Sequence, residues 1–196
     1  MGLLFVKGQS DLITTVILVG VTIVIGVGFL SFVAPNISRV VGESNMKAVL
    51  YEEQSNIVVY KEFENATQLC IGLLRIAPGT TVYSIAILDE NLNSIINTSH
   101  TNLVYFPPNP QPVATSRITP PKKVYYIAGG DYYPIPHEIS VVYIPQNLTS
   151  NYIGKGRPLL LCIRKNSIPG DQMARIFILV SLNNNLYEVG RVYVSK

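Results

Sequence analysis

The chain begins with a long stretch in which polar and charged positions are almost absent. Leu12 to Ala34 is a run of twenty-three residues without a formal charge. At about 1.5 Å per residue a helix of this length measures roughly 35 Å, enough to cross a hydrocarbon core of about 30 Å. Such a helix is apolar on every face, so lipid or other helices must surround it. The pattern predicts a membrane-spanning helix near the amino terminus.

Beyond the apolar run the periodicity remains helical for a short distance. Pro35 predicts a kink or an end of the first helix. Apolar residues at three- and four-residue spacing then predict a second helical stretch, broken at Gly42 and ending near Glu53. A strand over Lys47–Tyr51 is the alternative for its last part.

From about Asn56 onward the period becomes that of β-strands, with turn residues such as Gly129-Gly130-Asp131 between the apolar runs. The predicted strands are Ile57–Phe63, Gln68–Ile76, Thr80–Leu88, Leu103–Phe106, Lys123–Ala128, Glu138–Ile144, Pro158–Ile163, Arg175–Leu182 and Leu186–Val194. Short strands at this spacing are typical of a sandwich or barrel. The predicted fold is therefore α+β, one long N-terminal apolar helix followed by an all-β immunoglobulin-like sandwich.

A single basic residue and a polar step precede the apolar run. Lys7 and Gly8 are followed by Gln9-Ser10-Asp11, and the apolar residues begin at Leu12. An ordinary secretory signal places its cleavage site after an apolar region of about 7 to 15 residues. Here the basic–small pair comes first, so cleavage after Gly8 would leave the helix on the mature protein.

These residues resemble the class III signal peptide of type IV pilins and archaeal pilin-like proteins. The resemblance covers about the first thirty-five residues and implies that a prepilin peptidase cuts between Gly8 and Gln9. Bacterial members carry a glutamate five residues into the mature chain, where this sequence has Ile13, so the archaeal members are the better match. The resemblance implies a membrane-inserted precursor whose helix later packs among identical helices in an extracellular filament.

The resemblance and the patterning together predict three segments. Residues 1–8 form the leader, 9–53 the transmembrane or filament-core helix and stalk, and 54–196 an extracellular β-sandwich domain. The implied function is that of a structural subunit of an archaeal type IV pilus-like homopolymer, with an outward domain for adhesion or protection. An uncleaved, membrane-anchored accessory protein of the archaellum stator type is the alternative, its sandwich binding an envelope or surface-layer partner.

Small residues in the apolar run are candidates for helix–helix packing. They are Gly20, Thr22, Gly26 and Gly28. Thr22 and Gly26 form a small-xxx-small pair, a spacing that lets two helix backbones approach closely. The alternative interpretation is that membrane helices are simply rich in glycine.

Two features of the chain favour an extracellular location for the β region. Cys70 and Cys162 lie in apolar strand runs, where they are either two buried thiols or a disulfide that joins two sheets of the sandwich. N-glycosylation sequons begin at Asn36, Asn65, Asn97 and Asn147. Asn97 and Asn147 lie in the most turn-like polar context and are the better candidates.

The composition argues against several other functions. The net charge is only +3 and the basic residues are scattered, unlike a nucleic-acid-binding surface. His100 and His137 are not part of a Cys/His cluster, so neither a metal nor another cofactor is predicted. The sequence contains no nucleophile elbow and no phosphate-binding loop. We therefore do not predict an enzyme.

Two further groups of side chains have a functional and a plainer interpretation. The acidic residues Glu52, Glu53, Glu62 and Glu64 are predicted to form a solvated face rather than a cation site. Tyr125, Tyr126, Tyr132, Tyr133 and Tyr143 are predicted to be half-buried strand residues, with a carbohydrate-stacking adhesive face as the alternative.

Overall fold

The computed structural model describes residues 5–95, 104–107, 115–119, 122–165, 168 and 173–194, with side chains from Ile13 onward. The chain divides into two units, Met1–Val49 and Leu50–Lys196. The first unit contains most of helix α1 (Phe5–Asn56), and the second contains the last turns of α1 and the strands of the β domain. The α+β class, with one long apolar helix followed by a β domain, is confirmed.

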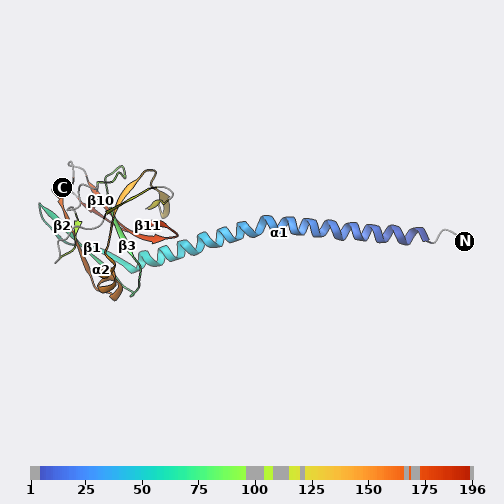
Figure 1. Ribbon diagram of the computed structural model, residues 1–196, viewed down its shortest axis with the longest axis horizontal. Coiled ribbons are helices and arrows are strands. Elements are labelled where there is room, and N and C mark those ends of the chain that lie inside the picture. Colours follow the sequence, from blue (N-terminus) through green and yellow to red (C-terminus); the bar gives the residue numbers. More distant parts are fainter. Residues whose placement is uncertain are drawn as a thin grey trace. The chain divides into compact units, whose positions relative to one another are not determined.

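Helix α1 passes through Pro35 and Gly42 and is drawn in Figure 1 as one continuous ribbon. The helix therefore does not end at Pro35, and the predicted break at Gly42 is wrong. The predicted helical stretch toward Glu53 is present, and the alternative of a strand over Lys47–Tyr51 is excluded. A proline lacks the N–H group that would bond to the carbonyl four residues earlier. The Nδ2 amide of Asn36 donates to the Phe32 carbonyl at 2.8 Å, within the turn that the proline weakens. The carbonyl that loses its partner at Pro35 is that of Ser31, so the Asn36 bond adds to this turn but does not replace the missing one.

The β domain consists of two sheets. The four-stranded sheet has the order β1 (Ile57–Glu64), β2 (Gln68–Arg75), β9 (Leu159–Arg164) and β4 (Val104–Tyr105). The seven-stranded sheet has the order β5 (Thr115–Ile118), β8 (Ile139–Tyr143), β3 (Tyr83–Leu88), β10 (Ala174–Leu182), β11 (Asn185–Val194), β6 (Val124–Ala128) and β7 (Asp131–Pro134). Neighbouring strands are antiparallel, apart from the parallel pair of β6 and β11.

Every predicted strand range contains a strand, whereas β5, β7 and the short helices α2 (Gln146–Asn151) and η1 (Ile153–Lys155) were not predicted. Strand β7 forms a hairpin with β6 in which Ala128 pairs with Asp131. The two turn residues between them, Gly129 and Gly130, have φ angles of 59° and 90°. Positive φ at both positions matches the right-handed twist of paired strands, which explains the two glycines. Strand β7 has only four residues and ends in a proline, so its pattern is too short to detect.

The two sheets pack against each other in the manner of a β-sandwich. Val59 of β1 lies over Gly190 of β11, where a Cβ atom would come within 2.9 Å of Val59 Cγ2. The central strands β3 and β10 are buried along most of their length, as is β2 in the other sheet. Apolar side chains from both sheets thus form the core that supports the features described below.

Candidate functional site: the apolar helix and its buried anchor

The first part of α1 exposes apolar side chains around its whole circumference. Every residue from Ile13 to Phe32 is exposed, with Val24 and Phe32 reaching 72%. In the described part of the chain α1 is the one helix long and apolar enough to cross a membrane. A contiguous apolar surface of this size requires lipid or protein to cover it.

Two hydroxyl groups inside this segment are bonded to the helix itself. Thr22 Oγ1 donates to the Leu18 carbonyl and Ser31 Oγ to the Val27 carbonyl, each at 2.8 Å and one turn back along the helix. Both hydroxyls are therefore satisfied within α1 without water or a partner chain. The segment remains compatible with both hydrocarbon and protein surroundings.

The four candidate packing residues lie on different sides of the helix. At about 100° per residue, Thr22 and Gly26 fall on one face, whereas Gly20 and Gly28 fall on others. No atom lies within 4 Å of the place where a Cβ would stand on Gly20, Gly26 or Gly28. The chain itself therefore gives no steric reason for glycine at these positions.

An apolar stripe continues along α1 beyond the length that a membrane needs. Ile37, Val40 and Val41 are 57%, 58% and 51% exposed and recur at three- and four-residue spacing. Together with Phe32, Val33 and Asn36 they line a shallow, largely apolar hollow of about 300 Å³. The spacing is that of a helix face which packs against a neighbouring helix.

The last turns of α1 are fixed in the β domain by a buried ion pair. The Arg75 guanidinium donates from Nε to Glu53 Oε1 and from Nη2 to Glu53 Oε2, each at 3.0 Å. The Tyr83 hydroxyl donates to the same carboxylate, and Arg75 Nη1 donates to the Ala77 carbonyl. Glu53 and Arg75 are 7% and 8% exposed. The prediction that the acidic residues form a solvated face is wrong for Glu53, because Arg75 and Tyr83 compensate its burial.

The hydrogen bonds of this cluster decide the ionisation of its members. Burial alone would raise the pKa of Glu53, but the hydrogen bonds from Arg75 and Tyr83 outweigh it, and the pKa is lowered. Burial and the neighbouring Glu53 carboxylate raise the pKa of Tyr83. The hydrogen bond to Glu53 raises the pKa of Arg75. The cluster therefore holds one carboxylate, one guanidinium and one neutral phenol at neutral pH.

No family model, curated protein or solved structure matches this chain. Only the structure identifies Arg75 and Tyr83 as the partners of Glu53. Arg75 and Tyr83 are 22 and 30 residues away from it in sequence, so no local spacing connects them. Arg75 itself was the one residue that could have indicated a buried ion pair. It lies at the end of an apolar strand, and a charged residue needs a compensating partner when it is buried there.

A second acidic residue anchors the tip of the β1–β2 hairpin. Glu64 accepts hydrogen bonds from Lys165 Nζ at 2.7 Å and from Lys61 Nζ at 2.6 Å. These bonds lower the pKa of Glu64 to about 2. Glu64 is thus paired with two lysines. In the described residues no group of three His, Cys, Asp or Glu side chains is placed to hold a metal ion.

The predicted tyrosines are half-buried, except Tyr133, which is 48% exposed. The ring of Tyr125 stacks on Tyr187 with centroids 4.8 Å apart, and Tyr132 meets Tyr187 edge-on at 5.6 Å. The Tyr132 hydroxyl accepts a hydrogen bond from Gln54 Nε2 at 3.1 Å. Because Gln54 belongs to the last turn of α1, this cluster ties the β6–β7 hairpin to the end of the helix.

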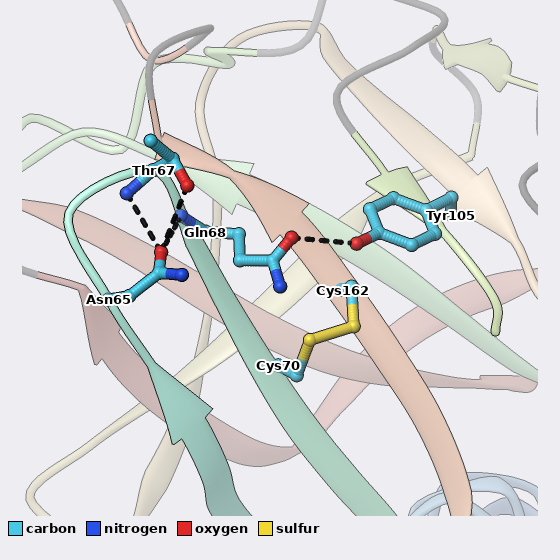
Figure 2. Close-up of a disulfide and its surroundings, with 6 residues drawn as sticks. All are labelled: Asn65, Thr67, Gln68, Cys70, Tyr105 and Cys162. Atoms are coloured by element: carbon cyan, nitrogen blue, oxygen red, sulfur yellow. Dashed lines mark hydrogen bonds between the residues drawn. A yellow bond between two sulfur atoms is a disulfide. The ribbon is translucent and has the colours of Figure 1, made fainter.

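The two cysteines form a disulfide in the structure, shown in Figure 2. Cys70 and Cys162 are direct partners in the antiparallel pairing of β2 and β9. The bond therefore joins neighbouring strands of one sheet, and the prediction that it would join two sheets is wrong. Because its ends are 92 residues apart in sequence, it still closes a long loop of the unfolded chain.

The remaining candidate residues are spread over the chain. Lys7, Gly8 and Gln9 lie in the first turns of α1, and their side chains are outside the described part. Among the sequon asparagines, Asn36 is in α1, Asn65 in the β1–β2 turn and Asn147 in α2. Asn97 and His100 lie outside the described residues. His137 Nε2 lies 3.0 Å from the Leu92 carbonyl.

We expect acid to destabilise the β domain through Glu53 and Glu64. Both carboxyl groups have a lower pKa in the folded state, so the unfolded chain binds more protons as the pH falls. The resulting stabilisation is present above the ordinary value of 4.5 and is lost as the pH falls toward 2. Thermal unfolding of the whole chain in detergent should show a midpoint temperature that is steady near neutral pH. This temperature should decrease as the pH falls below 4.5.

The variant Glu64→Gln is the control for that titration. It removes one of the two groups, so its midpoint should fall less steeply in the same acid range. A midpoint that stays constant down to about pH 2 would show that the carboxylates do not stabilise the fold.

Proposed function

We propose that this chain is a structural subunit of an archaeal type IV pilus-like extracellular filament, built by packing of α1 among identical helices. The observation that supports this most is the exposed apolar surface of α1, which surrounds the helix from Ile13 to Phe32 and continues as a stripe to Val41. The prepilin-type arrangement of Lys7, Gly8 and the apolar run is the second support.

The length of the helix favours assembly over simple anchoring. About 20 residues suffice to cross a hydrocarbon core. From Ile13 the helix continues for 44 residues to Asn56, roughly 66 Å at 1.5 Å per residue, although its uncharged run ends at Ala34. A monomeric anchor would leave Ile37, Val40 and Val41 in water, whereas neighbouring helices in a filament would cover them. The same surface of α1 would thus contact lipid in the precursor and other subunits in the filament.

The proposal places the β domain outside the cell. Arg39 and Lys47 follow the apolar run and Lys7 precedes it, so the distribution of positive charge gives no clear orientation. The disulfide between Cys70 and Cys162 is the better support, because disulfides persist in oxidising surroundings. In this position the β domain would form the filament surface and serve adhesion or protection, with a cell-surface or carbohydrate ligand as its candidate partner.

The amino terminus of the native protein tests the proposal. We expect filaments visible by electron microscopy whose subunits begin at Gln9, as read by mass spectrometry. The variant Gly8→Val should block cleavage by the prepilin peptidase and abolish filaments, because the enzyme must fit a small residue before the cut. Gly2→Val is the matched control and should assemble normally.

A native chain that begins at Met1 and is extracted as a monomer would overturn this proposal. If its β domain were then found bound to an envelope or surface-layer protein, the chain would instead be a membrane-anchored accessory protein.

A further inference from the structure

The turn that joins β1 to β2 holds the side chain of Asn65 in one orientation. Asn65 Oδ1 accepts hydrogen bonds from the Thr67 N–H at 2.8 Å, the Thr67 hydroxyl at 3.0 Å and the Gln68 N–H at 2.8 Å. Figure 2 shows these bonds converging on the one oxygen. Such an Asx turn uses the oxygen alone, and Asn65 is exposed to solvent. The amide nitrogen of a sequon asparagine is thereby oriented and accessible.

Neighbouring contacts hold this turn in place. The Lys165 N–H donates to the Thr67 carbonyl at 2.8 Å, and the ammonium group of the same lysine reaches Glu64 Oε1 at 2.7 Å. The disulfide between Cys70 and Cys162 joins β2 and β9, the strands that directly follow Thr67 and directly precede Lys165. The orientation of Asn65 is therefore supported from two strands and does not depend on the loop alone.

The sequon at Asn147 lacks this geometry although the asparagine is exposed. It lies in α2, where the Thr149 N–H donates to the Pro145 carbonyl at 3.0 Å. The Thr149 hydroxyl also points to the Pro145 carbonyl, and the residue is 3% exposed. The threonine that defines this sequon is thus buried and turned away from Asn147.

The sequon at Asn36 is unsuitable for a different reason. Its own Nδ2, the atom that would carry a glycan, donates to the Phe32 carbonyl at 2.8 Å. That bond supports the turn of α1 around Pro35. A glycan there would replace one of the two Nδ2 protons and place a large polar group on the apolar helix beside this bond.

We propose that Asn65 is the N-glycosylation site among these three asparagines and that Asn36 and Asn147 stay unmodified. The donor is a glycan activated by a phosphate on a lipid carrier. Asn65 Nδ2 bonds to the anomeric carbon as the bond from that carbon to the phosphate oxygen breaks. The phosphate leaves with the bonding electrons, and Nδ2 gives one proton to a base of the transferring enzyme. The three hydrogen bonds to Oδ1 orient the side chain and leave Nδ2 to meet the donor.

The position of Asn65 fits a surface role for such a glycan. Strand β1 begins at Ile57, directly after α1, and its eight residues end at Glu64. At about 3.3 Å per residue Asn65 lies roughly 26 Å along the strand from the junction with the helix. The glycan would extend from the end of the β domain that is distant from this junction. This inference rests on the extracellular location given under the proposed function.

One tryptic digest of the native protein tests the inference. Cleavage at Lys and Arg places Asn65 on Glu62–Arg75, Asn147 on Val124–Lys155 and Asn36 on a peptide that ends at Arg39. After reduction, we expect the Glu62–Arg75 peptide to carry the mass of a glycan on Asn65, at an occupancy at least about tenfold above the other two. Thr67→Ala should abolish the modification and Thr67→Ser should retain it, since serine preserves the hydroxyl and the sequon.

The same digest separates failure of this inference from failure of the proposed function. The peptide that ends at Arg39 begins at Gln9 if the leader was removed and at Gly8 if trypsin cut an unprocessed chain. An unmodified Asn65 in subunits that begin at Gln9 overturns the inference alone. Equal modification of Asn147 also overturns it, because the geometry would then not select the site. A glycan on Asn65 in an unprocessed chain supports the inference and contradicts the filament.

Discussion

Replacement of Glu53 by alanine is expected to lower the free energy of unfolding by about 3 to 5 kcal/mol, because it leaves a buried charge without its partner. Arg75 is 8% exposed and donates two hydrogen bonds to the Glu53 carboxylate. The variant also removes the acceptor of the Tyr83 hydroxyl, which is completely buried. Neither group can recover its hydrogen bonds from water without opening the junction between α1 and the strands.

Urea unfolding of the full-length protein in detergent, followed by near-ultraviolet circular dichroism, measures this effect on the β domain. Glu52→Ala is the matched control, because the adjacent Glu52 is exposed and has the same side chain. We expect the control to change the free energy by less than about 0.5 kcal/mol, as is usual for surface positions. The loss of free energy of unfolding for Glu53→Gln should lie between those of Glu53→Ala and Glu52→Ala, because an amide keeps an acceptor but not the charge. Equal effects of Glu52→Ala and Glu53→Ala would show that the ion pair does not stabilise the junction.

The sequence predicted those parts of the fold that depend on local periodicity. Runs of apolar, β-branched or aromatic residues between turn residues located strands as different as Gln68–Arg75 and Asn185–Val194 within a few residues of their bounds. The same pattern did not reveal β5, because its four residues Thr115–Ile118 contain a single apolar side chain. A strand of this kind is defined by its neighbour β8 rather than by its own composition.

Features that depend on distant partners could not be predicted in the same way. Local rules favour a helix end at Pro35, but α1 continues through this residue. Glu53 looked like a surface acid because its partners are remote in sequence. The pairing of Cys70 with Cys162 required the order of the strands, which places β2 beside β9. The sequon rule likewise cannot distinguish Asn65 from Asn147, since the difference lies in where each threonine hydroxyl points.

The variant Gly26→Ile is expected to abolish or strongly reduce filaments while leaving the chain inserted in the membrane. A Cβ at Gly26 meets no atom of this chain within 4 Å, so the monomer accommodates the larger side chain. Isoleucine is also the better helix former, by roughly half a kcal/mol. If the face with Thr22 and Gly26 packs closely against a neighbouring helix, the added atoms should cost about 1 to 3 kcal/mol at each contact. This corresponds to roughly a 5- to 150-fold weaker association between subunits.

Filament yield by electron microscopy, together with the membrane-bound fraction by sedimentation, separates packing from anchoring in this variant. Val24→Ile is the control, because Val24 faces away from Gly26 on the helix and is 72% exposed. It adds one methylene to the apolar surface and should assemble nearly as the unaltered chain does. Gly26→Ala should give an intermediate yield, since one methyl group separates the backbones less than a branched side chain.

Normal filaments from Gly26→Ile would exclude close packing at this face, and loss of membrane binding would mean that the residue acts in insertion. A graded loss of filaments with full membrane binding is the result that only contact between helices of neighbouring subunits explains.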